Sequence, residues 1–244
     1  MSKINLLLTL LSLDALLVIL ERISPTTRII LQPYSYMRVH EVFQMSVVIA
    51  ISIVISFLLL KVISNNFAAL RTKSGTILGT IFMLGIYFTA TGNGLHEVAS
   101  FLYNTFCNIK ATGTGICGAS FFDDYYFGNI VYFVGLLFSN LALILLELRS
   151  PLSKSDTKQT IISIANGVLY ALTLFAYAAF DRVLVGLWFV TIMAVLVVFV
   201  VIVNNLAKRD LASLGKRLTL TPFTLYSLTA YCLSTILTAI IRFK

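Results

Sequence analysis

Seven long apolar segments divide the chain, and short polar segments separate them. Each holds about the 20 mostly apolar residues that an α-helix needs to cross a bilayer. None alternates apolar and polar positions as a strand of a membrane barrel does, so we predict helices throughout. The sequence therefore predicts an all-α, polytopic bundle of seven transmembrane helices that forms one integral membrane domain over 1–244, with spans at 4–20, 42–60, 76–102, 127–146, 160–180, 183–203 and 222–241.

The first predicted span is the shortest, and a cleaved signal peptide is the alternative interpretation of it. The segment ERISPTTR that follows holds no small-residue cleavage site, which favours an uncleaved span. Were it removed, six spans would remain.

The Lys and Arg residues are divided unequally between the two ends of the predicted bundle. Eleven of the 18 lie at the N-terminus and in the segments 61–75, 149–159 and 204–221, which all belong to one end. Cytoplasmic segments carry the excess of Lys and Arg, so the N-terminus is predicted to lie inside. Cys107 and Cys117 then lie in the outer loop 103–126, where a disulfide persists; two free thiols are the alternative.

The composition excludes a soluble protein and explains the basic charge. Hydrophobic residues make up 59% of the chain and charged residues 11%, against about 25% charged in soluble domains. The net charge is +8, but the basic residues are scattered and form no patch interleaved with aromatic residues. We therefore predict no nucleic-acid partner, a multi-pass location in a membrane, and the lipid bilayer as the main partner.

Polar residues recur at helical spacing on four predicted spans. The third span carries one polar face made of Thr89, Asn93, His96, Glu97 and Ser100. The fourth, fifth and seventh spans have comparable stripes: Tyr125, Asn129, Tyr132 and Ser139; Ser163, Asn166, Tyr170, Thr173 and Tyr177; Thr224, Ser227, Tyr231, Ser234 and Thr238. Two interpretations stand, namely hydrogen bonds across helix contacts and the lining of a polar cavity.

Ionisable side chains gather at the predicted outer side of the membrane. A charge at the bilayer centre costs about 2.5–3.5 kcal/mol or more, so such residues face the bundle interior and mark functional sites. Both histidines, His40 and His96, lie on the outer side, each followed by a glutamate. Asp124, near the start of the fourth span, is predicted to belong to the same outer cluster.

Three kinds of chemistry fit this outer cluster, and a purely structural role is a fourth interpretation. His40, His96 and one carboxylate from Glu41, Glu97 or Asp124 would supply three zinc ligands, although no HExxH spacing is present. A histidine beside a carboxylate also suits a proton relay. Binding of a substrate, lipid or cofactor without catalysis is the third. In the structural interpretation, His96 and Glu97 only fix helix packing.

Two short motifs resemble part of a seven-helix membrane metal-hydrolase superfamily that includes alkaline ceramidases and progestin/adiponectin-type receptors. They are NGLH at 93–96 and FDD at 122–124. The resemblance implies a zinc hydrolase with a further histidine pair in the last helix. The last span here, PFTLYSLTAYCLSTILTAII, holds no histidine. The resemblance thus implies that the hydrolase has been lost or that His40 and Glu41 complete the site.

We therefore predict a polar pocket that opens toward the outer face and takes a lipid or another small amphiphile, as a hydrolase or a degenerate relative of one. A proton-coupled transporter and a non-catalytic subunit bound to other membrane-complex partners are the alternatives. The candidate residues are, as catalytic groups, His96, Glu97 and Asp124; as binding groups, Asn93, Thr89, Ser100, Asn129 and Tyr132; as zinc ligands, His40, His96 and Glu41.

Overall fold

The computed structural model describes residues 2–108, 114–149, 156–180, 183–207 and 220–244, and within them seven helices are long and apolar enough to cross a membrane. The seven predicted spans are confirmed, and most are longer than predicted. They are α1 (Lys3–Arg22), α2 and α3 joined as one helix (Val39–Ile63), α4 (Lys73–Phe106), α5 and α6 joined as one helix (Ile116–Arg149), α7 (Thr157–Phe180), α8 (Val185–Ala207) and α9 (Pro222–Arg242).

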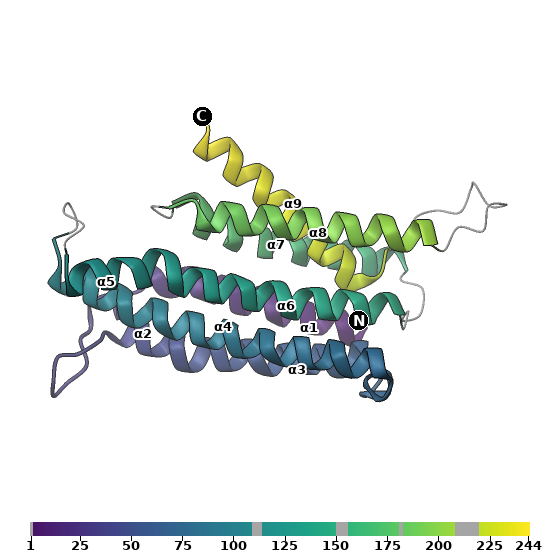
Figure 1. The fold of residues 1–244 in the computed structure, drawn as a ribbon, viewed down its shortest axis with the longest axis horizontal. Coiled ribbons are helices and arrows are strands. Elements are labelled where there is room, and N and C mark those ends of the chain that lie inside the picture. The colour runs from purple at the N-terminus through teal and green to yellow at the C-terminus, as the bar shows by residue number, and fades with distance from the viewer. Residues whose placement is uncertain (1, 109–113, 150–155, 181–182, 208–219) are drawn as a thin grey trace.

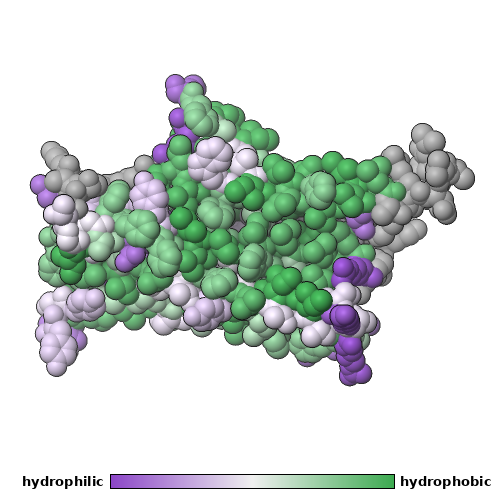
Figure 2. Space-filling model, in the orientation of Figure 1, coloured by the Kyte–Doolittle hydropathy of each residue, from purple (hydrophilic) through white to green (hydrophobic). Residues whose placement is uncertain are grey.

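The helices form two groups that lie against each other (Figure 1). The first group contains α1 to α6, and the second contains α7, α8 and α9, with α9 crossing its neighbours at a steep angle. The visible surface is apolar over the middle of the bundle and hydrophilic toward its ends (Figure 2). This distribution matches a bilayer around the middle and water at both ends.

The connection between the third and fourth spans is shorter than the predicted loop 103–126. Helix α4 continues to Phe106 and α5 begins at Ile116, because the apolar and aromatic residues at both edges pack between the helices. The predicted disulfide is confirmed, with the Cys107 and Cys117 Cα atoms 5.6 Å apart. The bond closes the remaining connection at the end of the molecule that the charge distribution places outside.

Two membrane helices contain a π-helical turn. One covers Gln44–Val48 between α2 and α3, and the other covers Asp123–Phe127 between α5 and α6. Such turns insert one extra residue into a helix and are frequent at functional sites. We call the end that carries the Cys107–Cys117 bond the outer end, and both turns lie in the half of the bundle nearer to it.

Helices α4 and α6 pack backbone to backbone through glycines spaced seven residues apart on each helix. A Cβ atom built on Gly92 would lie 2.2 Å from the Tyr132 backbone nitrogen, and one built on Gly135 would lie 2.3 Å from the Thr89 nitrogen. Gly85 makes a similar approach to α6. Small residues drive this type of association in membranes because they allow close van der Waals packing.

Helices α1 and α7 are joined by hydrogen bonds instead. The Asn5 side chain donates to the Gln159 carbonyl at 3.0 Å and accepts from the Ser163 hydroxyl at 2.9 Å. One helical turn further out, the Asn166 amide donates to the Thr9 hydroxyl at 3.0 Å. Interhelical hydrogen bonds of this kind contribute about 0.6 kcal/mol each on average. The inner half of the polar stripe on the fifth span therefore serves a helix contact.

Glu147 links α6 to the start of α9. Its carboxylate, fully buried, accepts the backbone N–H groups of Phe223 and Thr224 at 2.9 Å each, and the Thr221 hydroxyl at 2.5 Å. The first N–H groups of a helix have no partner within it, so Glu147 caps α9 from another helix. The polar stripe of α9 is buried against neighbouring helices as well, at Thr224, Ser227, Tyr231, Ser234 and Thr238.

Replacing Gly92 by alanine should destabilise the protein, because the new methyl group meets the backbone of α6, which cannot rotate away. We expect a loss of about 1–3 kcal/mol. Gly94 lies on the same helix and has nothing within 4 Å of its built Cβ, so Gly94→Ala is the control. It should be neutral or more stable, since alanine is the better helix former. Unfolding in mixed micelles, followed by circular dichroism, measures both, and equal stabilities would contradict the packing.

Replacing Glu147 by alanine should leave the buried N–H groups of Phe223 and Thr224 without an acceptor. The expected loss in unfolding free energy is about 3 kcal/mol or more. Glu147→Gln keeps one acceptor oxygen and should lie between the wild type and the alanine variant. The same unfolding assay measures both variants, and an alanine variant as stable as the wild type would rule out the capping role.

Candidate functional site

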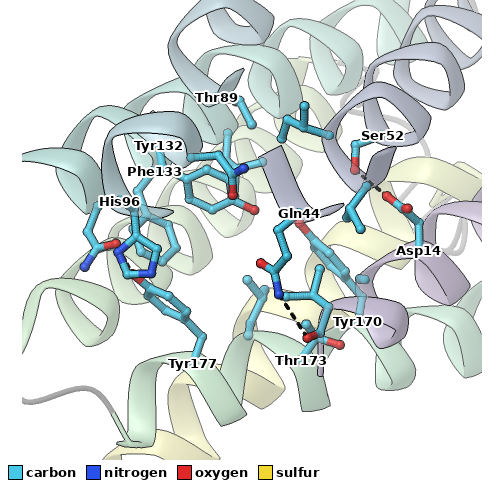
Figure 3. A pocket seen from close by; sticks show the side chains of 18 of the residues that line it. Asp14, Gln44, Ser52, Thr89, His96, Tyr132, Phe133, Tyr170, Thr173 and Tyr177 are labelled. Atoms are coloured by element: carbon cyan, nitrogen blue, oxygen red, sulfur yellow. Dashed lines mark hydrogen bonds between the residues drawn. The ribbon is translucent and has the colours of Figure 1, made fainter. Parts of the chain in front are cut away.

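A cavity of about 510 Å³ lies inside the bundle, between the first group of helices and α7. Side chains from α1, α3, α4, α6 and α7 line it, and apolar residues form much of its wall (Figure 3). All eight residues predicted as catalytic or binding groups are among those lining the cavity: Thr89, Asn93, His96, Glu97, Ser100, Asp124, Asn129 and Tyr132.

The cavity reaches the surface at the outer end of the bundle. Four lining residues are exposed, and each is at or near the outer end of its helix: Arg22, Ile23, Asn104 and Phe180. Together they surround a mouth between α1, α4 and α7. Of these four side chains only Arg22 carries a charge.

His96 is held between Asp124 and Arg22 just inside the mouth. Its Nδ1 atom is 3.0 Å from Asp124 Oδ1 and 2.9 Å from the Asp124 carbonyl oxygen, while its Nε2 atom is 3.2 Å from Arg22. A guanidinium only donates, so Nε2 accepts from Arg22 and Nδ1 carries a proton toward Asp124. Both ring nitrogens are therefore engaged.

Arg22 also pairs with Glu97, which follows His96 on α4. The Arg22 guanidinium is 3.6 Å from Glu97 Oε1, and the Glu97 side chain is 2% exposed against 43% for Arg22. A buried carboxylate needs a nearby cation or donors, because water no longer solvates it. Arg22 thus connects α1 to the polar face of α4 and is the cation that balances Glu97.

The local backbone explains how His96 and Asp124 meet. Asp124 belongs to the π-helical turn between α5 and α6, and Gly128 follows that turn. A Cβ atom on Gly128 would lie 2.9 Å from the His96 backbone nitrogen, so only glycine lets the two helices approach here. The glycine contact of α4 with α6 and the π-helical turn together place the carbonyl and the carboxylate of Asp124 against one imidazole.

Asn129 and Tyr177 extend this polar arrangement to α7. The Asn129 amide donates to the Asp124 carbonyl at 3.0 Å, and its oxygen accepts from the Tyr177 hydroxyl. The Tyr177 ring also meets the His96 ring edge to face, with centroids 6.3 Å apart. The outer half of the polar stripe on the fifth span therefore lines the cavity, unlike its inner half.

The structure gives His40 and Glu41 other partners than His96. His40 Nδ1 lies 2.5 Å from Glu21, and Glu41 accepts the Arg38 backbone N–H at 2.8 Å at the start of α2. Neither residue lines the cavity. Among the residues that the structure describes, no three His, Cys, Asp or Glu side chains are grouped to hold a metal ion, so the predicted zinc site gains no support.

Four further residues were not predicted to belong to the site, namely Asp14, Arg22, Gln44 and Ser52. All four line the cavity. Asp14 accepts a hydrogen bond from the Ser52 hydroxyl of α3 (Figure 3). The Gln44 amide, in the other π-helical turn, donates to the Val18 carbonyl at 3.4 Å. An acidic residue inside an apolar span was the available signal for Asp14, whereas Arg22 looked like an ordinary charge at a helix end.

Comparison of the chain with protein-family models, with curated proteins and with solved structures finds no match.

The Arg22–Glu97 contact should appear as an energetic coupling. We expect Arg22→Ala and Glu97→Gln to be non-additive by about 1 kcal/mol in unfolding free energy, a value kept small because Arg22 is partly solvated. Arg28→Ala, which removes an exposed arginine outside the cavity, is the control and should add to Glu97→Gln. A double-mutant cycle in mixed micelles measures this coupling, and additivity for Arg22 would show that the pair does not interact.

Proposed function

We propose that the protein binds a small amphiphilic molecule in the cavity and admits it through the mouth beside Arg22. The cavity itself is the main support for this proposal, because it has apolar walls and a charged, hydrogen-bonding end. Ligand sites typically measure about 300–1,000 Å³ and combine apolar walls with a few placed polar groups. The cavity of about 510 Å³ falls in this range.

The contacts around His96 favour binding over hydrolysis. A general base needs a free nitrogen within reach of the proton that it removes. Arg22 already occupies Nε2, and Asp124 occupies Nδ1. Within the described ranges, no serine or threonine hydroxyl donates a hydrogen bond to His96. Hydrolysis therefore stays a prediction from the resemblance to the metal-hydrolase superfamily and is not part of this proposal.

Transport of the same molecule is the second candidate function. The position of the cavity opening allows transport to be compared with binding. The exposed lining residues all lie at the outer end, and Glu147 fastens α9 to α6 at the opposite end. This arrangement corresponds to a cavity open to one side. A transport cycle would need a second conformation open to the other side, so binding is the function that the geometry supports best.

Filling the cavity should expel the amphiphile. Ala176 lines the cavity on α7, whereas Ala165 on the same helix is exposed and lies outside the cavity. Native mass spectrometry of the purified protein should show a retained amphiphile with the wild type and with Ala165→Phe. Ala176→Phe should retain at most a tenth as much. Equal retention by both variants, or none by the wild type, would contradict the proposal.

A further inference from the structure

Asp14 lines the cavity, and one oxygen of its carboxylate has no hydrogen-bond partner. It lies near the middle of α1 and is 5% exposed. Oδ2 accepts a hydrogen bond from Ser52, while Oδ1 is buried and has no hydrogen-bond partner. Figure 3 shows Asp14 and Ser52 facing each other at the side of the cavity opposite His96.

An unpartnered carboxylate at this depth is costly for the protein. A charged side chain at the centre of a bilayer costs about 2.5–3.5 kcal/mol or more unless another group compensates it. The Ser52 hydroxyl supplies only one neutral hydrogen bond. Asp14 therefore lacks a cation or further donors from the residues that the structure describes.

The charges along the cavity show which kind of group would compensate Asp14. Three carboxylates line the cavity, those of Asp14, Glu97 and Asp124, but Arg22 is the one Lys or Arg residue in the lining. Arg22 already contacts Glu97 and His96. It is also eight residues from Asp14 on α1, which is about 12 Å along the helix axis. The described cavity thus carries more negative than positive side chains.

Aromatic side chains surround the same part of the cavity. Tyr132, Phe133 and Tyr170 all line it, and Figure 3 shows their rings between Asp14 and His96. The face of an aromatic ring attracts a cation, by about 0.5–2 kcal/mol depending on how far the cation is desolvated. Anions gain nothing from such faces. A carboxylate together with aromatic rings is a suitable environment for an organic ammonium group.

From these observations we infer that the amphiphile carries an amine, and that its ammonium group binds the Asp14 carboxylate deep in the cavity. The inference rests on the proposed binding function and specifies the ligand class of that site. The ammonium group donates to the carboxylate and neutralises Asp14, and the apolar part of the molecule lies along the wall. Ser52 is a positioning residue, because its hydroxyl orients the carboxylate.

Three probes with the same number of carbon atoms separate the charge from the hydrophobic contribution: dodecylamine, dodecanol and dodecanoate. An alkyl amine is protonated at neutral pH, as a lysine side chain is. The protein in phosphatidylcholine nanodiscs is titrated with each radiolabelled probe, and binding to empty nanodiscs is subtracted. Wild-type protein should bind dodecylamine at least tenfold more tightly than dodecanol, and dodecanoate most weakly.

Asp14→Asn is the diagnostic variant, since it has the shape of aspartate and can still accept from Ser52. It should lose the tenfold preference for dodecylamine while its affinity for dodecanol stays unchanged. Glu41→Gln, which removes a buried carboxylate outside the cavity, is the matched control and should keep the preference. Ser52→Ala should weaken dodecylamine binding several-fold and leave dodecanol binding unchanged.

The outcomes separate this inference from the proposed function. If dodecylamine and dodecanol bind wild type equally, or if Asp14→Asn keeps the preference, the ammonium assignment is overturned. The retention experiment with Ala176→Phe and Ala165→Phe then decides amphiphile binding separately. If none of the three probes binds above empty nanodiscs, the ammonium assignment also falls. If Asp14→Asn misfolds, Ser52→Ala decides the assignment, and unchanged dodecylamine binding by that variant would overturn it.

Discussion

The direct backbone contact between α4 and α6 is the constraint on which the site depends. Water does not drive helices together inside a bilayer, so their association relies on close packing and polar contacts. Glycines at 85, 92, 128 and 135 remove the side chains that would otherwise hold the two helices apart. The same approach brings His96 against the turn that carries Asp124. A larger residue at Gly128 would separate the imidazole from both oxygens that it contacts.

Polar residues inside this bundle serve three distinct purposes. Some hold helices together, as Asn5 and Ser163 do between α1 and α7. Glu147 satisfies the first backbone N–H groups of α9. The third set, which includes Asp14 and His96, lines the cavity. Asn5, Ser163 and Glu147 have hydrogen bonds within the protein. Asp14 is a buried carboxylate of the cavity wall that keeps one oxygen without a hydrogen-bond partner.

The architecture could be predicted from the sequence, because an apolar run of sufficient length has few alternatives to a membrane helix. The polar face of the third span could also be predicted, because the spacing of residues in the sequence determines which of them share one face of a helix. Contacts between residues of different helices could not be predicted in this way. Arg22 comes from the end of another span, and its contact with His96 depends on how α1 lies against α4. His40 was grouped with His96 by depth alone, and the structure places it beside Glu21 instead. The π-helical turns leave no periodicity signal in so short a segment.

The length of α4 has a consequence for the environment of the cavity. At 1.5 Å per residue its 34 residues extend about 51 Å, whereas the hydrocarbon layer is about 30 Å thick. Counted from Thr76, where the apolar run begins, about 20 residues reach the other boundary near Leu95. His96, Glu97 and Arg22 then lie at headgroup level, and Asp14 lies near mid-membrane. The cavity therefore extends from the polar headgroup region at its mouth to the low-dielectric hydrocarbon layer around Asp14. A thicker bilayer would strengthen the charge interactions at the mouth and leave the environment of Asp14 unchanged.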